Sequence, residues 1–156
     1  MKYTRLTQEQ LEALHQEFAK FLATQSIDAK EWNELKENKP EVAEQELDIF
    51  SDLVWEGALN KVVYVENNSS DKLFLFHFAK ETIELLLIKN SNPEIDLTTL
   101  EGLEWLQKNV KAESIEIYTS SKGYSEDSNL DKFKLIQQGS VISEGTLFKA
   151  LKALIA

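Results

Sequence analysis

The sequence predicts an α+β fold with N-terminal helices, a β-meander plus one further strand in a mixed four-stranded sheet, and C-terminal helices, with helices covering both faces of the sheet. Two changes in hydrophobic period carry this prediction. Apolar residues recur at three- and four-residue steps over the first 60 residues, then alternate over residues 62–88. These are the periods of an amphipathic helix and of a strand. Helical spacing returns after residue 98 and is interrupted by one further alternating segment at residues 114–119.

The first third of the chain carries three helix starts. Residues 7–10 have the form of a capping box, in which Thr7 caps the helix and Gln10 bonds back to it. A second box at residues 28–31 opens a short helix. Pro40 suits the first position of a third helix, because the backbone amide that proline lacks is not needed there. We expect this helix to run to about Asn60.

Three strands follow as a meander, at residues 62–65, 73–79 and 82–88. Only Lys80 and Glu81 separate the last two strands, and so short a connection predicts an antiparallel hairpin. Both faces of this hairpin are apolar, so we expect helices on each side of the sheet.

The second half of the chain alternates helices with one more strand. A box at residues 98–101 starts a helix, residues 114–119 form the fourth strand, and residues 120–128 read as a polar loop. Two helices close the chain, from about Asn129 to Gln138 and from Thr146 onward. Because no internal repeat or break in composition appears, we expect one globular domain over residues 1–156.

Composition excludes several kinds of chemistry. The 156 residues contain no cysteine, which removes disulfides, thiol catalysis and cysteine metal sites. The net charge of −10 repels phosphate backbones and anionic lipid, so neither nucleic acid nor a membrane is an expected partner. The N-terminal residues carry no apolar signal region, which favours the cytoplasm. No cofactor fingerprint, metal site or catalytic triad is recognisable.

One histidine lies within an apolar strand. A symmetric turn at residues 80–81 places His77 opposite Glu84 across the hairpin. Such a pair puts two titratable groups on one face. The functional interpretation is an acid–base pair or half of a metal site. The structural interpretation is a core histidine whose polar atoms are satisfied by a carboxylate.

The segment after the fourth strand is the best candidate for a ligand site. Its hydroxyl, amide and ammonium groups suit an anion, and ligands commonly bind beyond strand ends. The candidate residues of this Ser120–Ser125 loop are Ser120, Ser121, Lys122, Gly123 and Tyr124. An ordinary polar turn is the alternative, because no phosphate-binding glycine motif is present and two acidic residues follow.

Three large apolar residues lie away from the core stripes of their helices. Trp55 and Leu59 project near acidic positions of the third helix, and Trp105 is similarly displaced. Such side chains can mark a surface for a protein partner or a second copy of the chain, or they can be covered by other helices.

The whole chain resembles a small bacterial family with no assigned activity. Residues 2–7 (KYTRLT), 132–136 (KFKLI) and 141–143 (VIS) carry the resemblance. It implies a bacterial cytoplasmic protein and transfers no catalytic residue. Two hypotheses follow: a non-enzymatic binding or protein-interaction domain, favoured by the missing catalytic motifs, or a small-molecule or anion site at residues 120–125 with His77 and Glu84 nearby.

Overall fold

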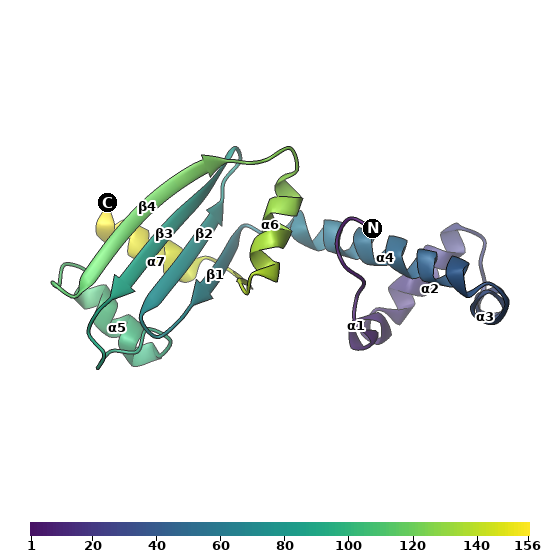
Figure 1. Cartoon of the computed structure of the whole chain (residues 1–156), viewed down its shortest axis with the longest axis horizontal. Coiled ribbons are helices and arrows are strands. Elements are labelled where there is room, and N and C mark those ends of the chain that lie inside the picture. The colour runs from purple at the N-terminus through teal and green to yellow at the C-terminus, as the bar shows by residue number, and fades with distance from the viewer. The chain divides into compact units, whose positions relative to one another are not determined.

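The computed structural model describes all of residues 1–156 and divides them into two compact units, Met1–Asn60 and Lys61–Ala156. The first unit is helical and the second contains the sheet (Figure 1). The predicted α+β fold class is therefore confirmed. That the two units act as one globular domain stays a prediction.

Four helices make up the first unit: α1 (Gln8–Ala13), α2 (His15–Thr24), α3 (Ala29–Asn38) and α4 (Pro40–Leu59). The predicted caps are present, since Thr7 and Gln10 exchange side-chain bonds and Asp28 accepts from the amide of Glu31. The sequence predicts one helix after Thr7, whereas the structure has two, α1 and α2, which meet at Leu14. There the ring Nδ1 of His15 lies 3.0 Å from the carbonyl oxygen of Glu12, so a side chain contacts the backbone at the break.

Aromatic rings form the core of the first unit. Phe18 of α2 contacts Trp32 of α3 and Phe50 of α4, with ring centroids 5.1 and 5.0 Å apart. The segment before α1 is held by the acidic side of α4, because the amides of Lys2 and Tyr3 donate to Asp52 at 2.8 and 2.9 Å. Part of that acidic face is therefore occupied by backbone donors rather than solvent.

The second unit contains a five-stranded sheet of order β4-β3-β2-β1-β5, in which every neighbouring pair is antiparallel. Its strands are β1 (Tyr64–Asn68), β2 (Lys72–Phe78), β3 (Thr82–Asn90), β4 (Ile115–Gly123) and β5 (Val141–Ser143). The prediction of four strands in a mixed sheet was wrong on both points. With only three residues, β5 is too short to show a period. β4 starts beside Asn90, where β3 ends, so the chain returns at the same end of the sheet.

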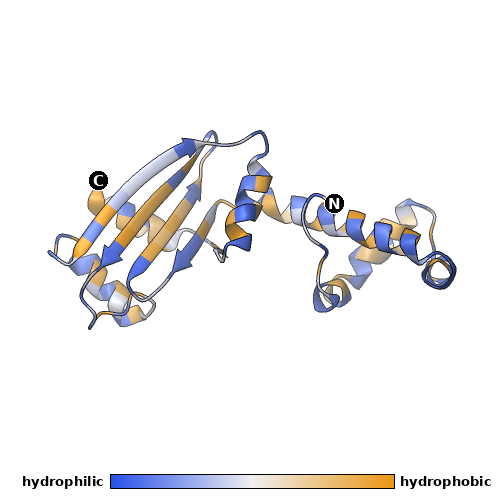
Figure 2. Cartoon of the chain, viewed as in Figure 1, coloured by the Kyte–Doolittle hydropathy of each residue, from blue (hydrophilic) through white to orange (hydrophobic).

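Helices cover both faces of the sheet, as predicted. α5 (Leu100–Lys108) and α7 (Thr146–Ile155) pack on the face formed by buried leucine and isoleucine side chains of β2 and β3. α6 (Ser128–Gln137) packs on the opposite face near β1, where Val65, Phe78 and Ile83 are buried. Figure 2 shows the hydrophobic residues concentrated along β2 and β3. No helix combines the length and the hydropathy that a membrane crossing requires.

Capping residues set the ends of the later helices. The N-cap of α5 is Thr99, one residue after the predicted Thr98, and its side chain accepts from the amide of Gly102. α6 ends as predicted before Gly139, which takes a φ of 109°. α7 begins after Gly145 at a φ of 81°, a left-handed conformation that glycine adopts without steric cost.

Candidate functional site

A row of polar side chains crosses the sheet of the second unit. The strand register aligns Ser143, Tyr64, His77, Glu84 and Ser121 on β5, β1, β2, β3 and β4. Residues that face each other across antiparallel strands share a face of the sheet. The row therefore lies on the face that α7 covers, next to the paired side chains of Leu75 and Leu86.

The predicted facing of His77 and Glu84 is confirmed. His77 Nδ1 lies 3.1 Å from Glu84 Oε2, and the two side chains are 25% and 30% exposed. Hydrogen bonds from His77 and then from Lys152 hold the pKa of the Glu84 carboxyl below its usual range. Because an ionised carboxylate only accepts, Nδ1 of His77 must carry the proton and donate.

Two aromatic rings fix the imidazole of His77. The Tyr64 ring stacks on it, with centroids 4.6 Å apart and planes 17° from parallel. Phe148 of α7 lies 5.5 Å from the imidazole and 5.7 Å from the Tyr64 ring. Both ring contacts and the bond to Glu84 hold the imidazole in one orientation.

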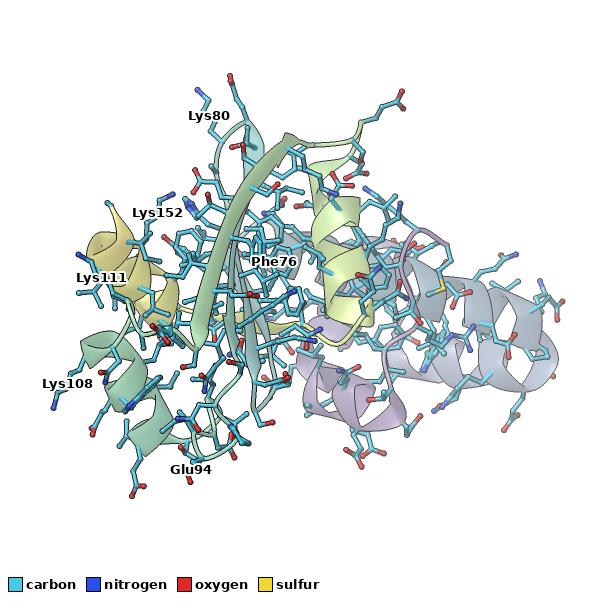
Figure 3. All side chains as sticks on the ribbon, turned by 60° about the vertical axis from the view of Figure 1, so that its left-hand side comes forward. Phe76, Lys80, Glu94, Lys108, Lys111 and Lys152 are labelled. Atoms are coloured by element: carbon cyan, nitrogen blue, oxygen red, sulfur yellow. The ribbon has the colours of Figure 1, made fainter.

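α7 brings a cation to the same carboxylate. Lys152 Nζ lies 3.2 Å from Glu84 Oε2, and the lysine side chain is 55% exposed. Phe148 and Lys152 are four residues apart, so both project from one side of the helix toward the sheet. Figure 3 labels Lys152 on α7.

A groove of about 560 Å³ lies between α7 and the β3–β4 edge of the sheet. One wall is apolar, with the side chains of Phe148 and Ile155 in its lining. The polar lining comes from Glu84, from Lys152 and from Thr119 and Ser121 of β4, whose side chains share the face of Glu84. Groups from three elements thus converge on one concave surface, which is typical of small-molecule sites.

The expected loop at residues 120–125 is in large part strand. β4 continues to Gly123, four residues past the predicted end, because β3 supplies a pairing partner for every residue as far as Thr82. Backbone pairing here outweighs the weak strand preference of serine and glycine. Of the candidate residues, Ser120 and Ser121 line the groove.

The other three candidates lie elsewhere. Lys122 faces Ile83 and so belongs to the opposite face of the sheet, and Gly123 ends the strand opposite Thr82. The Tyr124 hydroxyl donates to the carbonyl oxygen of Ala79, and burial raises the pKa of this phenol. None of the three belongs to the groove lining.

The three off-stripe apolar residues do not form an exposed patch. Leu59 is completely buried. Trp55 is half-buried, with its ring centroid 6.4 Å from that of Tyr3. Trp105 packs half-buried against the core cluster under the sheet. Their displacement from the helical stripes therefore does not by itself indicate a partner surface.

Sequence reasoning missed the contributions of Tyr64, Phe148 and Lys152. The only local hint was the four-residue spacing of Phe148 and Lys152, which many amphipathic helices share. Nowhere in the chain do three or more His, Asp or Glu side chains lie in a group that could hold a metal ion.

The fold and the groove define a small α+β protein with one polar row across an antiparallel sheet. The chain belongs to a family of unknown function, DUF6495, whose model matches residues 1–156. This confirms the resemblance to a family without an assigned activity. No curated protein and no solved structure matched the chain.

Proposed function

We propose that the groove between α7, β3 and β4 binds a small organic molecule that has an apolar body and a singly charged anionic head, such as a carboxylate. The observation that carries the proposal is the convergence of Glu84, Lys152 and Ser121 on a concavity with an apolar wall. The volume of about 560 Å³ lies within the range of ligand pockets.

The polar end of the groove can supply donors to such a head. A lysine ammonium has three N–H donors, and Glu84 accepts one from Lys152. The side chain of Ser121 shares the face of Glu84, which adds a hydroxyl donor. A carboxylate placed between Lys152 and Ser121 would receive charge-assisted bonds, which are stronger than neutral ones.

The apolar end suits a hydrocarbon or aromatic body. Phe148 and Ile155 of α7 line this side. Burial of apolar ligand surface there contributes roughly 25 cal/mol per Å². The net charge of −10 acts against multiply charged anions, so we favour one negative charge over a nucleotide or a polyphosphate.

His77 supports this site without touching the ligand. It does not line the groove, and its Nδ1 is bonded to Glu84. Glu84 in turn holds Lys152 by an ion pair. We therefore assign His77 and Glu84 to the positioning of Lys152, which makes the proposal one of binding rather than catalysis.

The test is a binding screen by protein NMR. Each carboxylic acid is paired with its neutral amide of the same body. Carboxylates are expected to shift the amide resonances of β4 and α7 more than their amides do. Lys152→Met should abolish this preference because it keeps the length of the side chain and removes the charge. Lys108→Met on α5, also exposed, is the matched control.

Thermal unfolding gives a second measurement. A ligand at a hundred times its Kd adds ~2.7 kcal/mol to the free energy of unfolding, which raises Tm by several degrees. The proposal fails if no carboxylate binds, if the shifted resonances lie outside the groove, or if Lys152→Met and Lys108→Met bind equally well.

A further inference from the structure

The free edge of β4 is long and unprotected. β4 is the last strand on its side of the sheet, and it pairs with β3 over nine residues in unbroken register (Figure 1). Its other side therefore presents unpaired backbone donors and acceptors. Residues 118–123 are all exposed.

β4 has few of the usual features that block edge pairing. The strand IEIYTSSKG contains no proline, its register shows no bulge, and Lys122 is its one lysine. Proline, bulges and lysines are the features by which edge strands avoid pairing with other chains. The opposite edge of the sheet differs, because β5 has only three residues.

The charges of β4 are arranged for pairing with a copy of itself. In a two-fold antiparallel pair, the axis passes through one residue and its copy. The register that pairs all nine residues puts this axis at Thr119. In that register Glu116 faces Lys122 of the second copy, and the reverse pair forms on the other side of the axis. Glu116 and Lys122 are the only charged residues of β4, so both of its charges are matched by opposite ones.

Registers displaced from Thr119 lose this match. An axis at Tyr118 puts Glu116 opposite Ser120, and an axis at Ser120 puts Lys122 opposite Tyr118. Each also leaves the end residues of the strand without partners. Backbone overlap and charge therefore favour the same arrangement.

We propose that the protein forms a homodimer through antiparallel pairing of β4 with β4 of a second copy, centred on Thr119. The pairing joins the two sheets into one continuous sheet and adds about eight to ten backbone hydrogen bonds. Tyr118, which is 49% exposed, then lies beside Ser120 of the second copy on the face opposite α7. This inference is independent of the ligand proposed for the groove.

Sedimentation of the full chain over a range of concentrations tests the proposal. A mass of twice 17.9 kDa is expected at high concentration. Glu116→Lys and Lys122→Glu each replace two attractive pairs by two repulsive ones. Each should raise the dimer Kd on the order of ten- to thirtyfold. The double variant, Glu116→Lys with Lys122→Glu, restores opposite charges and should return the Kd to near the wild-type value.

Matched controls separate the effect of charge pairing in the β4–β4 register from the effect of net charge. Glu94→Lys and Lys108→Glu make the same charge changes at exposed positions outside β4, and both should leave the dimer Kd unchanged. Circular dichroism checks that every variant is folded. Amide exchange of the wild type should show protection in residues 115–123 that increases with protein concentration.

A monomer at every concentration overturns the proposal. So does a dimer that both single variants leave intact, or a double variant no tighter than either single variant. Concentration-dependent protection confined to segments other than β4 also overturns it. The exchange measurement uses the wild type alone, so the proposal stays testable even if a variant fails to fold.

Discussion

Gly145 is the position where one added methyl group should disturb the candidate site most. Its φ of 81° is a conformation that other residues adopt at a cost. A Cβ placed there would lie 2.4 to 2.5 Å from three ring atoms of Tyr64. One of these is Cγ, the ring atom nearest the backbone, so a rotation that moves only the far end of the ring cannot relieve the clash. The Tyr64 ring is also held by its stack on His77.

The expected loss combines two effects. A non-glycine residue in the left-handed region costs on the order of 1–3 kcal/mol, and forcing extra atoms into a packed site costs typically 1–3 kcal/mol. We expect Gly145→Ala to lower the free energy of unfolding by about 2 to 6 kcal/mol, a large part of the ~5–15 kcal/mol that stabilises a domain.

Urea unfolding followed by far-ultraviolet circular dichroism measures this loss. Gly123→Ala is the control, because a Cβ there meets nothing within 4 Å and φ is not positive. It should change stability by less than about 0.5 kcal/mol. In a Tyr64→Ala background the steric part vanishes, so Gly145→Ala should cost about 1–3 kcal/mol from the backbone alone. Wild-type stability in Gly145→Ala would refute the reasoning, as would an equal loss with and without the Tyr64 ring.

Three further outcomes follow from the contacts. The folded state lowers the Glu84 pKa, so the carboxylate stabilises the fold above the unfolded pKa, and this contribution is lost as pH falls through the lowered pKa. The stability difference between wild type and Glu84→Gln should thus be larger at pH 7 than at pH 3. If the difference between their urea midpoints is the same at both pH values, this expectation is wrong. Leu75→Ala empties a fully buried core position and should cost about 2–5 kcal/mol in urea, whereas Leu100→Ala, at 74% exposed, should stay within about 0.5 kcal/mol. Asp52→Ala removes the acceptor of two backbone amides, and faster amide exchange at Lys2 and Tyr3 should reveal it; unchanged exchange would deny Asp52 that role.

The predictions that succeeded depend on residues close together in the chain. Thr7 and Asp28 cap helices because their side chains reach amides three residues ahead. His77 faces Glu84 because a two-residue connection at Lys80 and Glu81 fixes the register of the hairpin. In each case a few residues determine the geometry without help from the rest of the fold.

The predictions that failed concern partners distant in sequence. Ser120 and Ser121 read as a loop by composition, yet β3 draws them into a strand. β5 forms because β1 offers an edge to three residues that show no pattern alone. The helical angle of Leu59 left two interpretations open, a partner surface or a side chain covered by other helices, and only its complete burial in the fold decides for the second. Strand propensity and helical angle do not report what packs against a residue.

The sequence by itself determined the α+β class, the starts of most helices, the hairpin and the His77–Glu84 pair. Only the tertiary structure decided that the sheet is antiparallel throughout and that a groove lies beside Glu84. It also brought Lys152 to Glu84 across 68 residues of chain. The physical reason is the sequence separation of the interacting residues. Caps and turns arise from bonds within a few residues. A site assembled from β3, β4 and α7 exists only after α7 has packed on the apolar face of the sheet and buried it.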